Sequence, residues 1–301
     1  MLNPSPVRAG FDAVKRAPSL AVIEIAWRWI FGLVATVLLL LGLRAFLAGL
    51  SVSPADEAAL RGSDVTIALA ALLHLFQEQG VWERFFGIAF AVVVPTVLVW
   101  VAAATLGRVA VLKRLLLRPR VDASAVLYLT IARAALLFVC IALWYLWMMA
   151  CAFIAMSGET PDYPLYLLLS FVALPFIAIG WGILNWILSF APLFVARDSL
   201  PAMQAYNEAL ALARQERSRF ISVTTWLGIP RVAAMILVLV FALVALLVIQ
   251  SPVTATVLLT LVTLVYCAFA DYLYVVRLAA YSQIADKTVA MEANALLPPE
   301  R

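Results

Sequence analysis

The sequence predicts an all-α polytopic membrane protein whose six transmembrane helices form three hairpins. Only 13% of the 301 residues are charged, whereas 66% are hydrophobic, and soluble domains usually carry about 25% charged residues. The mean hydropathy is +1.05. The apolar residues also occur in runs long enough to cross a hydrocarbon core of about 30 Å, which takes about 20 residues of helix. A chain of this composition needs lipid as its solvent.

Six apolar runs have the length of a membrane span. They are Trp29–Leu50, Phe85–Leu106, Ala134–Met156, Pro164–Phe190, Val232–Ile249 and Pro252–Asp271. The last two form one uncharged stretch, which we divide at residues 250–252 because Pro252 removes a backbone donor and polar residues favour a turn. Pro175 and Pro192 predict kinking of the fourth run. Val65–Phe76 is too short to cross and predicts an interfacial or re-entrant helix.

The basic residues predict the orientation of these spans. With the N-terminus in the cytoplasm, 18 of the 21 Lys and Arg residues lie on the cytoplasmic side, and only Arg44, Arg61 and Arg84 lie outside. This asymmetry follows the positive-inside rule, so both termini are expected in the cytoplasm. Arginine outnumbers lysine 18 to 3, which indicates a GC-rich bacterial genome. The predicted location is therefore the bacterial inner membrane.

A recurring spacing divides the chain into three parts. A serine precedes an arginine by nine residues at Ser19 and Arg28, Ser124 and Arg133, and Ser222 and Arg231. The spacing predicts one six-helix domain over residues 1–290, with hairpin units of about 1–106, 107–200 and 201–290, and a short tail over 291–301. Two interpretations stay open. The units form a parallel threefold pseudo-repeat, or the positive-inside rule alone places arginines at cytoplasmic helix ends.

Three basic stretches predict amphipathic helices on the cytoplasmic side. They read VRAGFDAVKR, RVAVLKRLLLRPR and SLPAMQAYNEALALARQERSRF. Apolar residues recur at steps of three and four, in the third stretch at Leu200, Met203, Tyr206, Leu210 and Ala213. Such helices lie on anionic leaflets. The predicted partner is therefore a bilayer with anionic headgroups, together with a membrane protein partner or a second copy of this chain. No nucleic acid is expected.

Several polar residues lie at membrane depth, where charged side chains are rare. The candidate polar cluster consists of Glu24, Arg28, Arg133, Arg231, Asp271 and Arg277. Two interpretations stay open for it: a structural ion-pair cluster, or a polar vestibule that binds an anionic solute, a headgroup or a proton. Asn185 and Ser189 are candidates for hydrogen bonding between helices inside the membrane.

No motif of a known catalytic centre occurs in the sequence. GxSxG, HExxH and Walker patterns are absent, as is CxxC, and His74 is the only histidine. The three cysteines, Cys140, Cys151 and Cys267, lie in apolar runs and are expected to pack as small apolar residues. We therefore expect no catalytic, cofactor-binding or metal-binding residues and no enzymatic activity.

The six spans, the cytoplasmic N-terminus and basic linkers such as AMQAYNEALALARQERSRFISV resemble the membrane domain associated with some bacterial glycerophosphodiester phosphodiesterases. Related stand-alone membrane proteins of unknown function share this layout. The phosphodiesterase catalytic domain has no counterpart in this sequence, so the resemblance implies a layout but no catalytic residue. The expected function is transport or lipid handling through the cytoplasmic-side polar cluster. The alternative is a scaffold or accessory subunit of a membrane protein complex.

Overall fold

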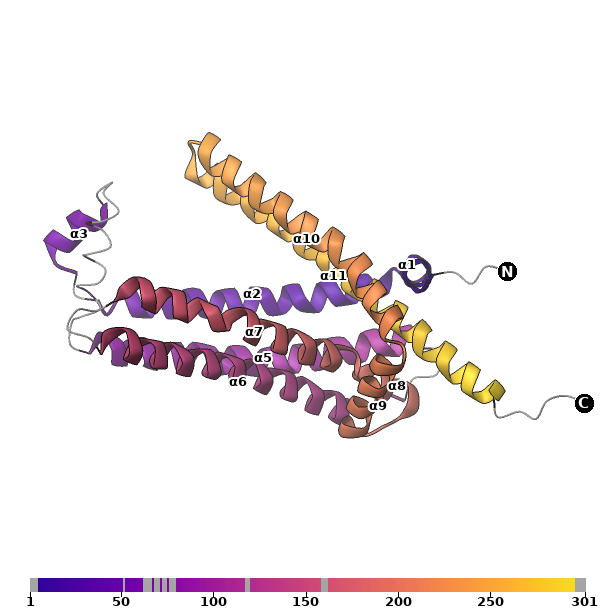
Figure 1. Ribbon diagram of the computed structural model, residues 1–301. Coiled ribbons are helices and arrows are strands. Elements are labelled where there is room, and N and C mark those ends of the chain that lie inside the picture. Colours follow the sequence, from indigo (N-terminus) through magenta and orange to yellow (C-terminus); the bar gives the residue numbers. More distant parts are fainter. Residues whose placement is uncertain are drawn as a thin grey trace, which may run out of the picture. The chain divides into compact units, whose positions relative to one another are not determined.

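The computed structural model describes residues 5–50, 52–61, 67, 71, 75, 80–116, 120–157 and 162–295 (Figure 1). All regular elements in these ranges are α-helices. Six of these helices are long and apolar enough to cross a membrane, namely α2 (Ser19–Leu47), α5 (Val81–Leu115), α6 (Ala123–Met156), α7 (Tyr163–Phe190), α10 (Arg217–Val248) and α11 (Pro252–Ala295). The protein is therefore an all-α, multi-pass integral membrane protein, as predicted.

Four shorter helices complete the described chain. They are α1 (Pro6–Arg16), α3 (Pro54–Arg61), α8 (Pro192–Asp198) and α9 (Ala202–Gln215). Apart from residues 67, 71 and 75, the helix predicted over Val65–Phe76 lies outside the described residues, and so do His74 and the tail from residue 296 onward.

The chain divides into two compact units, residues 28–103 and residues 1–27 with 104–301. In the first of these, α2 packs against α5. A Cβ atom on Gly42 would lie 2.5 Å from Val92 Cγ2, so only glycine lets the two helices approach this closely. The rings of Phe46 and Phe85 meet edge to face, with centroids 5.8 Å apart. The division into three hairpin units within one domain stays a prediction.

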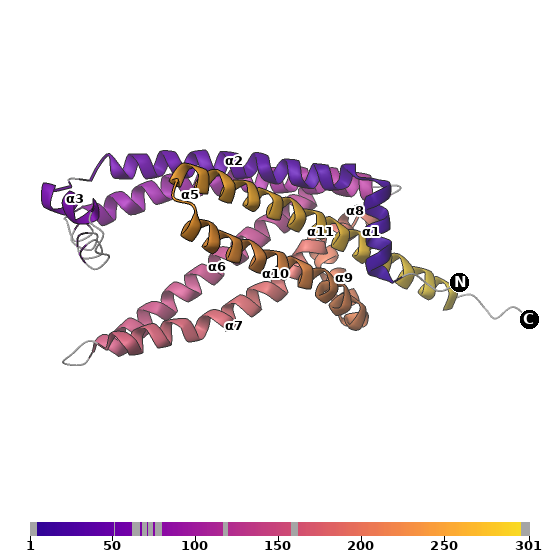
Figure 2. The same cartoon turned by 90° about the horizontal axis from the view of Figure 1, so that it is seen from above.

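In the larger unit, α6 pairs with α7 and α10 pairs with α11 (Figures 1 and 2). The turn between α10 and α11 lies at the predicted position, because α10 ends at Val248 and α11 begins at Pro252. Helix α7 continues through Pro175, and α8 begins at Pro192. Many large apolar side chains on the paired helices are exposed, among them Phe153, Phe176 and Leu247. Lipid is the solvent that such surfaces require.

The buried core of the larger unit lies at one end of the long helices, which we call the packed end. It combines α1, α8 and α9 with the adjoining segments of α2, α5, α6, α7, α10 and α11. An aromatic group forms its centre, in which the rings of Phe190, Phe220 and Tyr281 lie within 4.6–5.4 Å of one another. Trp186 donates a hydrogen bond to the Tyr281 hydroxyl at 2.8 Å, and Thr224 shares a hydrogen bond with the same hydroxyl at 2.7 Å.

The basic segments that were expected on the membrane surface contact this core. Helix α1 crosses α11 so closely that a Cβ on Gly10 would lie 2.5 Å from the Val276 carbonyl oxygen, and Val14 is buried. The stretch after the second span forms no separate helix, because α5 continues to Leu115 and buries Val111 and Leu112 in the core. The stretch is helical as far as Leu115 and buries the predicted apolar residues Val109 and Leu112, and its place on a membrane surface stays a prediction.

In and just before α9, most of the predicted apolar residues pack against the core, since Ala213 is buried and Leu200, Tyr206 and Leu210 are partly buried against it. Ala205, Ala209 and Leu212 are buried, together with the predicted Ala213, whereas Met203 is 71% exposed. Whether the exposed Met203 faces lipid stays a prediction. Small alanine side chains let α9 approach its neighbours closely, which a count of large apolar residues overlooks. The position of these helices relative to a membrane surface stays a prediction.

Candidate functional site

The packed end holds a buried ion pair. Glu24, on α2, is fully buried, and Arg108, on α5, is 6% exposed. Arg108 Nη2 lies 3.6 Å from Glu24 Oε1, and Trp27 Nε1 donates a hydrogen bond of 3.0 Å to Glu24 Oε2. Gly107 leaves no space for a Cβ beside the Trp27 ring, which lets α5 approach Trp27. A buried carboxylate is stable only with partners of this kind.

Tyr274, on α11, is the common neighbour of this ion pair and of further arginines. The Arg108 and Arg277 guanidinium carbons lie 4.7 and 5.0 Å from the centroid of its ring, distances at which a cation is attracted to an aromatic face. Glu24 and Arg133 also lie within electrostatic range of Tyr274. The Tyr274 hydroxyl donates to the Ser189 carbonyl oxygen at 3.3 Å. Helices α2, α5, α6, α7 and α11 thus contribute to one polar group.

Three of the six residues of the predicted cluster, Glu24, Arg133 and Arg277, therefore gather around Tyr274. Asp271, which is 6% exposed, and Arg231 both lie within electrostatic range of Cys267, one turn before Asp271 on α11. Arg28, the sixth residue, belongs to the other compact unit, residues 28–103, of which it is the first residue.

The two predicted hydrogen-bonding residues also lie beside this group. Arg133 Nε donates a hydrogen bond to Asn185 Oδ1, which joins α6 to α7. Ser189 is buried, and its hydroxyl donates to the Trp186 carbonyl oxygen at 2.6 Å. Asn185 thus makes a hydrogen bond between two helices. The Ser189 hydroxyl makes a hydrogen bond within its own helix, and the Ser189 carbonyl oxygen accepts one from Tyr274.

Arg108 and Tyr274 are not among the residues predicted for the cluster. Arg108 resembles an ordinary boundary arginine, and Tyr274 carries no charge. One signal for Arg108 is present in the sequence, since the apolar Leu106 precedes it and the apolar Val109, Val111 and Leu112 follow it. An arginine inside an apolar segment needs a buried partner.

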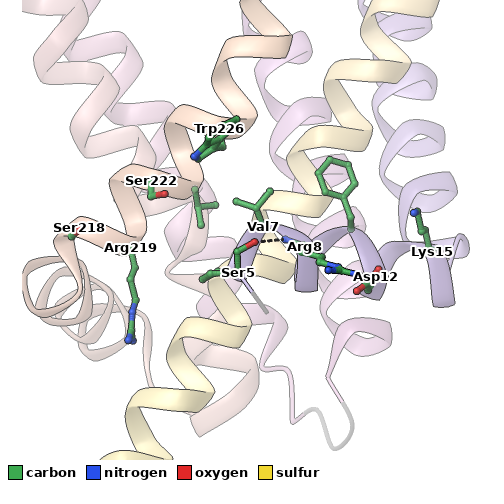
Figure 3. Close-up of a pocket in the computed structure, with 12 residues that line it drawn as sticks. Ser5, Val7, Arg8, Asp12, Lys15, Ser218, Arg219, Ser222 and Trp226 are labelled. Carbon is green, nitrogen blue, oxygen red and sulfur yellow. Dashed lines mark hydrogen bonds between the residues drawn. The ribbon is translucent and has the colours of Figure 1, made fainter. Parts of the chain in front are cut away.

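A second site is a groove between α1 and α10 with a volume of about 740 Å³. Figure 3 shows Arg8, Asp12 and Lys15 on α1 and Ser218, Arg219, Ser222 and Trp226 on α10, on either side of α11. The spacing of three and four residues places each set on one face of its helix. The Ser5 hydroxyl caps α1 by accepting a 3.3 Å hydrogen bond from the Arg8 backbone N–H.

The side chains around this groove favour an anion. Three basic residues, Arg8, Lys15 and Arg219, line it together with one acidic residue, Asp12. Arg219 Nη1 lies 3.2 Å from Glu216 Oε2, and the Arg219 side chain is 47% exposed. Trp226 is 68% exposed, and exposed tryptophans are typical of the membrane–water interface. Hydroxyl groups of three serines add hydrogen-bonding capacity.

The apolar continuation of α10 carries a further groove. It lies between α10 and α11 and has a volume of about 600 Å³, and its lining is apolar apart from the Tyr266 hydroxyl. Ala234, Leu237 and Phe241 lie on its α10 side, about one to three turns beyond Pro230. A basic groove and an apolar groove thus follow each other along α10.

Comparisons of this chain with protein families, with curated proteins and with solved structures find no match.

Proposed function

We propose that this protein handles anionic phospholipid and that the groove between α1 and α10 holds the lipid headgroup. The observation that carries this proposal is the set of three basic side chains, Arg8, Lys15 and Arg219, around a groove that also exposes Trp226. Each basic residue near an anionic membrane surface contributes about 1 kcal/mol to binding. The α10–α11 groove is the proposed place of one acyl chain, because it is apolar and follows the basic groove along the same helix.

The buried polar cluster supports lipid binding over the passage of a solute. Glu24 is fully buried, and the cavity beside Arg108 and Arg133 measures only about 20 Å³, room for little more than one water molecule. The α1–α10 groove is open by comparison and about 740 Å³ in volume. We therefore assign to the cluster the task of joining the helices, and to the groove the task of binding.

The proposal includes a location and an orientation. The protein resides in the bacterial inner membrane, with both termini and the packed end on the cytoplasmic side. The excess of basic residues on that side supports this orientation. The protein is non-catalytic, and its relationship to the membrane domain of bacterial glycerophosphodiester phosphodiesterases is part of the same proposal.

Native mass spectrometry of the full chain in neutral detergent tests lipid binding. Titration with phosphatidylglycerol is expected to give a tighter complex than titration with phosphatidylcholine. The double substitution Arg8→Gln/Lys15→Gln removes two contributions of about 1 kcal/mol each and should weaken phosphatidylglycerol binding about 30-fold.

The double substitution Arg214→Gln/Arg217→Gln is the matched control, since it removes two exposed charges that do not line the groove. This control should bind within about threefold of the wild type. Equal affinity for the two lipids, or equal loss in both double variants, would contradict the proposal and favour the scaffold role.

A further inference from the structure

One acidic side chain lies among the basic residues of the α1–α10 groove. Asp12 follows Arg8 by one helical turn and precedes Lys15 by three residues, and Figure 3 shows it between them along α1. Helix α1 packs against α11 and buries Gly10 and Val14. With 3.6 residues per turn, Asp12 lies on the side of α1 away from these two residues. The docking of α1 therefore leaves the Asp12 carboxylate at the groove.

The Asp12 carboxylate is available to a ligand. It is partly exposed, and in the part of the chain that the structure describes it forms no ion pair. Arg219, by contrast, has a carboxylate partner in Glu216 at 3.2 Å, and Glu216 does not line the groove. An ionised carboxylate offers about four lone-pair sites to hydrogen-bond donors. At Asp12 these sites are open to the contents of the groove.

A carboxylate is unfavourable in a groove whose only task is to hold an anion, because it repels the phosphate that Arg8 and Lys15 attract. It becomes favourable when the ligand also carries a hydrogen-bond donor. The donors of phospholipid headgroups are hydroxyl groups and ammonium groups. The three basic side chains of the groove repel an ammonium group, whereas a hydroxyl group is neutral. A hydroxyl group is therefore the better partner for Asp12.

We propose that Asp12 selects anionic phospholipids with a polyol headgroup by accepting a hydrogen bond from a headgroup hydroxyl. This inference rests on the proposed function, since the phosphate of the same lipid occupies the groove beside the basic residues. A hydrogen bond to an ionised acceptor is roughly twice as strong as a neutral one. A lipid without the hydroxyl displaces water from the carboxylate and gives it no donor in return, which lowers its affinity.

Two lipids of equal charge test this selection. Phosphatidylglycerol and phosphatidylpropanol with the same acyl chains are both monoanionic phosphodiesters with a three-carbon headgroup, but only phosphatidylglycerol has headgroup hydroxyls. In native mass spectrometry of the full chain in neutral detergent, the wild type should bind phosphatidylglycerol about tenfold more tightly, which corresponds to about 1.4 kcal/mol.

The same titrations separate this inference from the proposed function. Equal affinity for phosphatidylglycerol and phosphatidylpropanol, with phosphatidylcholine bound more weakly than both, would overturn the selection and leave the proposed function intact. Equal affinity for phosphatidylglycerol and phosphatidylcholine would overturn both. Phosphatidylethanolamine presents an ammonium group and should bind as weakly as phosphatidylcholine. If it bound as tightly as phosphatidylglycerol, Asp12 would recognise an ammonium group, and the selection of a polyol would be refuted.

Variants locate the selection at Asp12. Asp12→Ala should abolish the preference for phosphatidylglycerol and should bind phosphatidylpropanol more tightly than the wild type does, because the repulsion of the phosphate is lost. Glu216→Gln is the matched control, since it removes one negative charge beside Arg219 without changing the lining of the groove. It should strengthen binding of both lipids equally and retain the preference.

A preference that persists in Asp12→Ala would overturn the proposal. Weaker binding of both lipids in this variant would do the same, because it would show that Asp12 supports the structure of α1 instead of contacting the headgroup. The comparison of the two lipids on the wild type needs no variant and stays decisive if Asp12→Ala does not fold.

Discussion

Replacement of Glu24 by alanine removes the carboxylate that accompanies Arg108 in the core. Because Glu24 is fully buried and Arg108 is 6% exposed, the guanidinium would lose its counter-ion in a region of low dielectric constant. We expect the free energy of unfolding to fall by about 3–5 kcal/mol, as for other buried pairs that lose one partner. Denaturant unfolding in detergent measures this loss. Glu208→Ala, on the exposed side of α9, should change stability by less than about 0.5 kcal/mol, and an equal loss in both variants would refute the role of the pair.

A substitution at Tyr281 tests the contribution of the aromatic centre of the packed end to stability. Tyr281→Phe keeps the ring contacts with Phe190 and Phe220 but removes the hydroxyl that accepts the Trp186 hydrogen bond. The partly buried Trp186 indole N–H then lacks this acceptor, and we expect the free energy of unfolding to fall by about 1–3 kcal/mol. Tyr128→Phe is the control, because Tyr128 is 65% exposed. Equal stability of Tyr281→Phe and the wild type would show that the hydrogen bond contributes nothing.

At the scale of elements, the docking of α1 onto α11 depends on Gly10. A leucine at this position would collide with the Val276 carbonyl and with Ala280, so α1 would be displaced and the groove between α1 and α10 would lose one wall. Gly10→Leu should lower stability by about 1–3 kcal/mol and weaken phosphatidylglycerol binding in the same preparation. Gly228→Ala on α10, where a Cβ meets open space, should preserve both. Unchanged lipid binding in Gly10→Leu would contradict the placement of the groove.

Helix α6 begins with an aspartate cap whose contribution depends on pH. Asp122 accepts hydrogen bonds from the Ser124 hydroxyl at 2.7 Å and from the Ser124 backbone N–H at 2.8 Å. These bonds lower the pKa of Asp122 below its ordinary value of 3.8, against a smaller opposing effect of burial. The cap is therefore fully effective above the ordinary pKa and is lost as pH falls through the lowered value.

The stability difference between the wild type and Asp122→Ala should accordingly be constant from pH 7 to about pH 5. It should shrink as the pH falls below the ordinary range of aspartate. Unfolding curves of both proteins across this range measure the difference. A difference that grows on acidification would contradict this account of the cap.

The long helices were predictable from sequence because the bilayer thickness imposes a minimum apolar length on each span. The predicted spans were too short at the packed end, however. Helix α6 begins at Ala123 rather than Ala134, and α10 at Arg217 rather than Val232. Arg133 and Arg231 resemble boundary residues in sequence, but the helical hydrogen bonds continue past them into a protein core.

The partners within the site were less predictable. Glu24 and Arg108 lie far apart in the sequence. The same is true of the residues of α1 and α10 that line the α1–α10 groove. Hydropathy identifies which residues are polar, but only packing determines which of them meet. Arg133 and Asn185 illustrate this point, because both were candidates and only the structure joins them.

At the scale of the whole molecule, the central proposal is that this membrane protein binds anionic lipid in the groove between α1 and α10. Cysteine modification measures occupancy of that groove directly. In a variant whose Cys140, Cys151 and Cys267 are replaced by alanine, Ser222→Cys places one thiol in the groove. Arg217→Cys places one on the other side of α10, given 3.6 residues per turn.

The rate at which a soluble maleimide modifies these thiols is compared in bilayers of phosphatidylcholine with and without phosphatidylglycerol. We predict that phosphatidylglycerol slows modification of Ser222→Cys several-fold relative to that of Arg217→Cys. Equal modification rates of Ser222→Cys in the two bilayers would contradict lipid binding in this groove.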